Sequence, residues 1–91
     1  MSQVDFMAVP RLAQGYRFQW EEAQQNHVLL YPEGMVQLSD TAAAVLSLCD
    51  GQRTVQSIVV ELEEDYETDG ISEDVTQFLE EAEAQGWIKY A

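Results

Sequence analysis

Hydrophobic and polar positions change their spacing along the chain near Ser39. Before it, Tyr16 to Trp20 alternates strictly, which places three aromatic residues on one face of a strand. His27–Tyr31 is apolar enough for a second strand and Met35–Leu38 for a short third one, with Pro32-Glu33-Gly34 breaking the chain between them. The pattern therefore predicts an antiparallel meander of three strands.

From Ser39 onward the apolar positions recur every three or four residues, which predicts three helices, the first over Ser39–Cys49 and the second from Thr54 through Asp65. Each begins at a side chain that can accept a hydrogen bond from a first-turn amide, and each ends near a glycine. The predicted caps are Ser39, Thr54 and Ser72, and the predicted stops are Asp50-Gly51, Asp69-Gly70 and Gly86. The predicted buried stripes are Ala42, Val45, Leu46 and Cys49; Val55, Ile58, Val59, Leu62 and Tyr66; and Val75, Phe78, Leu79 and Ala82.

The two ends of the chain follow neither spacing. Residues 1–15 contain Pro10 and Gly15 without a sustained period, so we expect an N-terminal arm followed by one domain over residues 16–91. Trp87 to Tyr90 is apolar and should fold back on the core as an extended segment. Strands that precede helices indicate an α+β fold.

Charge narrows the range of partners. The chain has 91 residues, enough for one domain, and carries 4 Lys and Arg against 17 Asp and Glu, a formal net charge of −13. This charge repels phosphate backbones and anionic lipids, so we expect no nucleic acid and no membrane as partner. It would attract a basic peptide or protein, although it would equally serve solubility alone. With Cys49 as the only cysteine and no long apolar run, a cytoplasmic protein is expected.

Groups for catalysis or metal binding are scarce. His27 is the only histidine and lies in a predicted strand, while Cys49 lies in a helix stripe as a buried, inert thiol. Asp65, Glu67, Asp69 and Gly70 resemble the first half of a calcium loop, but its bidentate glutamate would fall on Thr76. We therefore predict no enzyme, no cofactor and no metal site, and interpret the acidic run as a solvated face.

Three surface features leave the partner open. The two consecutive capped helices have helix-turn-helix character, so a helix-turn-helix regulator or an acidic protein-interaction module is the alternative function, although the charge disfavours DNA. Met35–Leu38 is an edge strand in a simple meander and either accepts an extended peptide or is an ordinary short edge. Val60 lies on the polar side of its helix, as an isolated exposed valine or as a contact with a partner or a second copy. Monomer and homodimer both stay possible.

The order and spacing of several fragments resemble the PqqD family, the pyrroloquinoline quinone (PQQ) biosynthesis protein D family. The fragments are Pro10-Arg11-Leu12-Ala13, His27-Val28-Leu29-Leu30-Tyr31-Pro32-Glu33-Gly34, Leu38-Ser39, Asp50-Gly51-Gln52-Arg53-Thr54 and Phe78-Leu79. The resemblance implies a winged helix-turn-helix-like fold, with a three-stranded antiparallel sheet followed by a three-helix bundle. It also implies a peptide chaperone that binds the leader of the ribosomally made PQQ precursor. Such a recognition element presents the peptide to a radical SAM enzyme, which carries the iron–sulfur clusters and crosslinks a Glu and a Tyr.

The same resemblance implies a peptide-binding site. The leader would add to the third strand through Met35, Val36, Gln37 and Leu38, and would lie against the helix that starts at Ser72. In that helix Val75, Phe78 and Leu79 also serve the core, so only their cleft-side edges would reach the peptide, and polar contacts would come from Asp74, Gln77 and Glu81. An acidic wall of this kind predicts that basic leader residues help binding and that salt weakens it.

Overall fold

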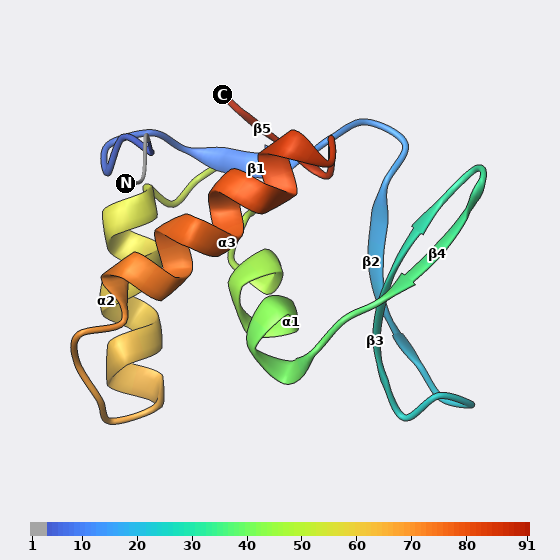
Figure 1. Cartoon of the computed structure of the whole chain (residues 1–91), viewed down its shortest axis with the longest axis horizontal. Coiled ribbons are helices and arrows are strands. Elements are labelled where there is room, and N and C mark those ends of the chain that lie inside the picture. Colours follow the sequence, from blue (N-terminus) through green and yellow to red (C-terminus); the bar gives the residue numbers. More distant parts are fainter. Residues whose placement is uncertain (1–3) are drawn as a thin grey trace.

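The computed structural model describes residues 4–91 and contains one three-stranded sheet, one pair of short terminal strands and three helices (Figure 1). The elements in chain order are β1 (Pro10–Leu12), β2 (Arg17–Glu21), β3 (Asn26–Tyr31), β4 (Gly34–Gln37), α1 (Asp40–Ser47), α2 (Val55–Asp65), α3 (Ser72–Ala84) and β5 (Ile88–Tyr90). The predicted α+β class, with three strands followed by three helices, is confirmed. None of the helices in the described part of the chain is long and apolar enough to cross a membrane.

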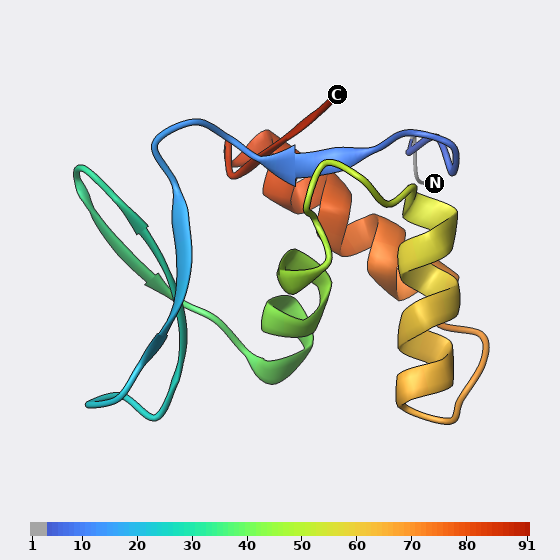
Figure 2. The same cartoon turned by 180° about the vertical axis from the view of Figure 1, so that it is seen from behind.

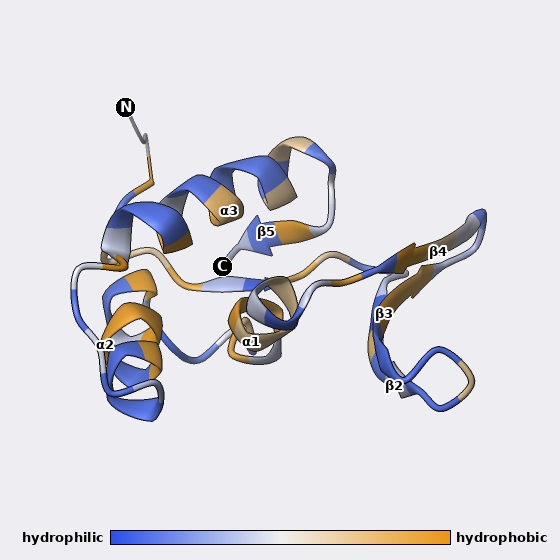
Figure 3. Ribbon diagram, turned by 60° about the horizontal axis from the view of Figure 1, so that its bottom comes forward, coloured by the Kyte–Doolittle hydropathy of each residue, from blue (hydrophilic) through white to orange (hydrophobic). Residues whose placement is uncertain are grey.

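The sheet is an antiparallel meander in the order β2-β3-β4. Strands β3 and β4 are joined through Pro32 and Glu33, with Tyr31 opposite Gly34 and Leu29 opposite Val36. All three predicted strands are confirmed to within one residue at each end. The sheet stands to one side of the helical body, and α1 lies between it and α2 in every view (Figures 1, 2 and 3).

Side-chain caps begin the first two helices, as predicted. The Ser39 hydroxyl accepts a hydrogen bond from the Ala42 amide at 3.1 Å, and the Thr54 hydroxyl accepts one from the Ser57 amide at 3.1 Å. The third predicted cap is wrong, because Ser72 is already inside α3. The N-cap of α3 is Ile71, whose side chain makes no capping hydrogen bond.

A carboxylate from α2 serves the start of α3 instead of Ser72. Glu63 Oε2 accepts hydrogen bonds from the amides of Gly70 at 3.0 Å and Ile71 at 3.5 Å. Because a side chain that is distant in sequence does the work of a cap, no local motif could reveal it.

Two helices end earlier than the glycines suggested. Helix α1 ends at Ser47, and Gly51, with φ of +77°, lies in the loop that follows. Helix α2 ends at Asp65, five residues before Gly70. Glu67, two residues after the helix end, takes the left-handed conformation with φ of +51°. Both glycines still occupy left-handed positions, but they turn the connecting loops and do not stop the helices.

Part of the expected arm pairs with the C-terminal segment. Strand β1 lies within residues 1–15 and pairs antiparallel with β5, with Arg11 opposite Lys89 (Figure 1). The Gly51 amide donates to the Pro10 carbonyl at 3.0 Å, which ties β1 also to the α1–α2 loop. The folding back of Trp87 to Tyr90 is confirmed as β5, whereas the arm carries a strand that its sequence did not indicate.

The core lies between the inner face of the sheet and the three helices. Leu29, Leu46, Ile58, Leu79 and Ile88 are its largest fully buried aliphatic side chains. Most of the predicted stripe residues belong to it, but Ala42 and Phe78 are only half-buried. Tyr66 was expected in the core and is instead 57 % exposed, because it lies past the end of α2. Coloured by hydropathy, β4 and much of β3 are hydrophobic, while α3 is dominated by hydrophilic positions (Figure 3).

Candidate functional site: an open strand edge and an apolar groove

Strand β4 has β3 as its only neighbour among the described strands, so its other edge is open. The Leu38 amide donates to the His27 carbonyl of β3 at 3.0 Å, directly after β4 ends. Bonded and non-bonded residues alternate along an antiparallel pair, so Val36 bonds to β3 while the amides and carbonyls of Met35 and Gln37 point away from it. These outward groups are positioned to pair with another extended chain.

Side chains on the two faces of β4 have different environments. Val36 faces inward and packs against the core, and Leu38, just after the strand, is buried. Met35 is 43 % exposed on the outer face. Gln37, on that same face, donates through its side chain to the Gln24 side chain at 2.6 Å. Of this stretch, therefore, the backbone of β4 and the exposed side chains of Met35 and Gln37 are the parts that a partner can reach.

An apolar groove begins where β4 gives way to α1. Its volume is about 380 Å³, and its walls come from α1, the C-terminal end of α2, the following loop and the first half of α3. The lining residues are Ser39, Thr41, Ala42, Ala44, Val45, Leu62, Tyr66, Thr68, Ile71, Asp74, Val75 and Phe78. A groove of this composition can accept apolar side chains, while the Asp74 carboxylate at its rim can pair with a cation.

The structure brings only part of the predicted site together. Asp74, Val75 and Phe78 line the groove, whereas Met35, Val36 and Gln37 belong to the strand with the open edge and do not line it. The remaining predicted residues line neither feature: Leu38 and Leu79 are buried, and Gln77 and Glu81 are exposed elsewhere on α3.

The hydrophobic pattern of the sequence did not reveal the α1 and α2 walls of this groove. Ala42 and Val45 were assigned to the core stripe, although they face the groove from α1. Tyr66 was assigned likewise and lines the groove from the far side. The width of the apolar stripes on these helices was the signal that could have revealed the groove. An apolar stripe that is too wide to be covered by the neighbouring helix leaves part of its surface exposed, where it can line a groove.

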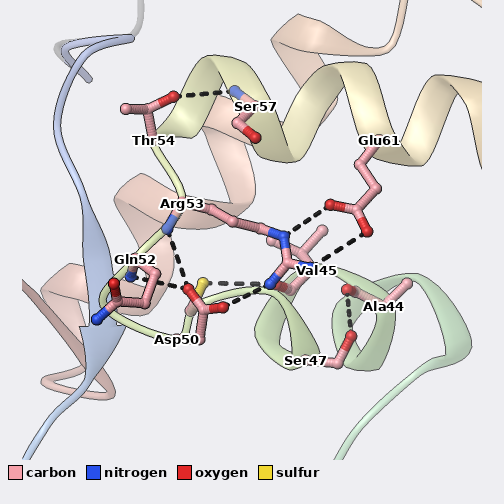
Figure 4. A network of polar contacts seen from close by, with 10 residues as sticks. Ala44, Val45, Ser47, Asp50, Gln52, Arg53, Thr54, Ser57 and Glu61 are labelled. Carbon is pink, nitrogen blue, oxygen red and sulfur yellow. Dashed lines mark hydrogen bonds and ion pairs between the residues drawn. The ribbon is translucent and has the colours of Figure 1, made fainter.

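A polar network ties the loop between α1 and α2 to α2 (Figure 4). Asp50 Oδ1 accepts hydrogen bonds from the amides of Gln52 at 2.9 Å and Arg53 at 3.1 Å. The Arg53 guanidinium pairs with Asp50 and reaches Glu61 on α2 with its Nε at 2.7 Å. The two amide bonds, helped by the nearby Arg53 charge, lower the pKa of Asp50 below its ordinary value. The network thus fastens the loop that joins two of the helices lining the groove.

The two candidate reactive side chains lie outside the groove lining. Cys49 is buried, its thiol donates to the Val45 carbonyl at 3.4 Å, and burial together with the neighbouring Asp50 charge raises its pKa to about 12. His27 stacks on Phe18 with ring centroids 4.9 Å apart. In residues 4–91 no group of three His, Cys, Asp or Glu side chains could hold a metal ion.

Comparison with known proteins gives one consistent family. Residues 26–88 match the family described as coenzyme PQQ synthesis protein D, PqqD. A protein of Azotobacter vinelandii named "PqqA binding protein" is 53 % identical over 98 % of both chains, and one of Methylococcus capsulatus with the same name is 58 % identical over 80 % of this chain and 78 % of its own.

A solved structure agrees with these sequence relatives. It is the solution NMR structure of the PqqD part of Methylobacterium extorquens PqqCD, described as a functional, stand-alone recognition element for ribosomally synthesized and post-translationally modified peptides. It has a TM-score of 0.80 and 34 % identity, covering 97 % of this chain and 96 % of its own. The winged helix-like fold is thereby confirmed. The fold, the family match and the relatives agree, and the chain belongs to the PqqD family of coenzyme PQQ synthesis proteins.

Proposed function

We propose that this protein is a peptide chaperone of PQQ biosynthesis that binds the leader region of the ribosomally made precursor peptide. The observation that carries the proposal is the open β4 edge, with an apolar groove starting at Ser39 where the strand has just ended. Relatives at about half identity that are named for binding PqqA support the choice of ligand.

The peptide would use the two features in succession. One stretch of the leader pairs with the outward backbone groups of Met35 and Gln37, extending the sheet by one strand. The leader peptide then passes Ser39 and places apolar side chains in the groove between α1 and α3, whose walls include Val45, Val75 and Phe78. A basic leader residue next to these side chains would meet the Asp74 carboxylate at the rim.

In this proposal the protein presents the peptide and a second protein carries out the chemistry. That second protein is the radical SAM enzyme of the pathway, which crosslinks a Glu and a Tyr of the precursor. The acidic surface from Glu61 to Glu83 gives the DNA-binding alternative no support, because it would be repelled by phosphates.

Calorimetric titration tests the proposal with three peptides: the full PQQ precursor, its leader alone, and the segment that carries the Glu and Tyr without the leader. We expect the first two to bind with similar affinity and the third to bind at least about tenfold more weakly, a difference of about 1.4 kcal/mol. Equal affinity for the leader and the leaderless segment would contradict leader recognition, and no binding of the full precursor would refute the proposed function.

A further inference from the structure

The inner face of the sheet carries stacked aromatic side chains beyond its fully buried part. Phe18 lies opposite Leu29, and His27 precedes Leu29 by two residues on the same strand, so all three side chains share this face. The Phe18 and His27 rings stack with centroids 4.9 Å apart, and the Trp20 ring meets His27 edge-on with centroids 5.1 Å apart. Leu29 is fully buried, whereas Phe18 and His27 are only half-buried and Trp20 is exposed. The core therefore leaves an aromatic surface uncovered at this end of the sheet.

This aromatic surface forms one side of a second hollow, of about 390 Å³, between the sheet and α1. We call it the sheet-side hollow, and its walls include Phe18, His27, Asp40, Ala44, Ser47 and Tyr66. Ala44 and Tyr66 also line the apolar groove, so the two spaces share these walls. Ala44 is small and Tyr66 is largely exposed, so neither is a buried barrier between the two spaces. A peptide that occupies the groove therefore lies directly beside the sheet-side hollow.

One carboxylate in the sheet-side hollow is available to a partner. Asp40 is exposed in the first turn of α1, and its carboxylate makes no hydrogen bond or ion pair with any other residue of the described range 4–91. The Ser47 hydroxyl is already used, because it donates to the Ala44 carbonyl at 2.8 Å. The hollow thus combines stacked rings with a carboxylate whose charge no basic side chain of the described residues pairs.

These walls match a basic side chain. The faces of aromatic rings attract a cation, and a neighbouring carboxylate adds an ion pair. An Arg side chain suits both, since its planar guanidinium stacks on rings and can form two hydrogen bonds to a carboxylate, while Lys supplies a compact charge. A second copy of this chain would also carry −13 and would be repelled on approach. The peptide in the groove, in contrast, already contacts the shared walls and is attracted if it is basic.

We propose that the sheet-side hollow is a second subsite for the leader peptide, in which a Lys or Arg side chain lies against the Phe18–His27 pair and meets the Asp40 carboxylate. The inference rests on the proposed function and extends it, because the groove then takes apolar side chains and the hollow takes a basic one. Since the two spaces share Ala44 and Tyr66, the basic residue should lie close in the leader sequence to the apolar residues that fill the groove.

A double-mutant cycle followed by calorimetric titration tests this pairing. The protein is changed by Asp40→Asn, and the leader of the PQQ precursor from the same genome is changed by replacing each of its Lys and Arg residues singly with Gln. Asp69→Asn is the matched control, because it removes the same charge from an exposed loop position that lines neither space. Thermal unfolding checks that each variant is folded.

We expect Asp40→Asn to weaken binding of the natural leader at least about fivefold, and to weaken binding of one of the Gln-substituted leaders less than about twofold, because that leader has already lost the partner of Asp40. Asp69→Asn should weaken binding of the same two leaders by less than about twofold and to the same extent. If no Lys or Arg position of the leader shows this coupling with Asp40, the subsite is overturned.

The imidazole of His27 reports independently on the hollow. His27 is the only histidine of the chain, so its Cε1–H signal is unique in an NMR spectrum, and it lines the hollow but not the groove. The natural leader should shift this signal, and the leader that lacks the coupled basic residue should shift it much less. Ser47→Lys places a cation in the hollow from the end of α1, and should reduce both the shift and the affinity, whereas Gln77→Lys on exposed α3 should preserve both.

The subsite and the proposed function fail in different ways. An imidazole signal that responds equally to the natural and the Gln-substituted leaders, or a Ser47→Lys variant that binds the leader like Gln77→Lys, would overturn the subsite while leader binding itself persists. No binding of the natural leader by the wild-type protein would instead refute the proposed function.

Discussion

At the scale of single residues, Asp50 holds the loop between α1 and α2 through its hydrogen bonds and its ion pair. Its carboxylate accepts two loop amides and pairs with Arg53, whose guanidinium also reaches Glu61 on α2. The residue is exposed, so its effect depends on geometry and not on burial. Because these bonds favour the charged form, the pKa of Asp50 is lower in the folded protein than its ordinary value of 3.8.

This shift predicts a pH-dependent contribution to stability. A lowered carboxyl pKa stabilises the fold at pH values above the unfolded pKa, and the contribution is lost as the pH falls through the folded pKa. Asp50→Asn keeps an acceptor oxygen but removes the charge. Urea unfolding should therefore show a larger deficit for Asp50→Asn at pH 6 than at pH 3, relative to wild type.

Asp69→Asn provides the control, since it changes the net charge equally at an exposed loop position outside the Asp50 network. A deficit for Asp50→Asn that stays constant from pH 6 to pH 3 would contradict the electrostatic role.

Single-residue features could be predicted where their cause is local. Ser39 and Thr54 cap helices whose first amides lie three residues away, so sequence spacing was sufficient. The prediction of Ser72 as a helix cap was wrong because Glu63 reaches the start of α3 from another helix. The prediction of Tyr66 as a buried residue was wrong because the hydrophobic stripe continues in the sequence past the point where α2 ends.

At the scale of elements, the register of β3 and β4 decides which backbone groups of β4 bond to β3 and which face outward. The Leu38–His27 bond fixes the alternation, so the Val36 amide belongs to the sheet and the Gln37 amide faces outward. An edge strand tolerates proline where its amide points to solvent. The same strand can therefore be altered at its open edge without breaking its pairing with β3.

Gln37→Pro should fold and lose affinity for the precursor peptide, because it removes an outward donor. The expected loss is about tenfold, since one net backbone hydrogen bond is worth about 0.5–1.5 kcal/mol and the proline ring also hinders the incoming strand. Gln37→Ala is the matched control: it removes the same side chain, with its bond to Gln24, and keeps the amide. Calorimetry that finds equal affinity in the two variants would count against strand addition.

Elements formed by local pattern were predictable, and the pairing of the chain ends was not. The β2-β3-β4 meander follows from alternation and a proline-containing turn between strands that are adjacent in sequence. Strand β1 has three residues, and its partner β5 lies at the other end of the chain. The groove is likewise assembled from three helices, so the sequence pointed to its α3 wall only through family resemblance, while its α1 wall was assigned to the core.

At the scale of the whole molecule, negative charge is concentrated on the helical side. Most of the acidic residues lie between Glu61 and Glu83, on α2, on α3 and in the loop that joins them. Asp74 brings this charge to the rim of the groove. A peptide with basic residues would therefore be attracted before it makes contact, and the attraction would be screened by salt.

Affinity for the precursor peptide should fall several-fold between 50 and 500 mM NaCl, because the Debye length shortens from above to below about 10 Å over this range. Calorimetric titrations at these salt concentrations measure the effect. A leader in which Lys and Arg are replaced by Gln should bind more weakly and respond less to salt. Affinity that is independent of salt for the natural leader would contradict an electrostatic contribution from the acidic wall.

Amide hydrogen exchange gives a direct test of peptide pairing along β4. It is followed by NMR on the protein alone and on the protein saturated with the precursor leader. Without peptide the amides of Met35 and Gln37 are open to solvent, whereas the Val36 amide is already bonded to β3. Saturation with the leader should slow exchange of the Met35 and Gln37 amides strongly and should change that of the Val36 amide much less. Unchanged exchange at both outward amides with the leader fully bound would contradict peptide pairing along β4.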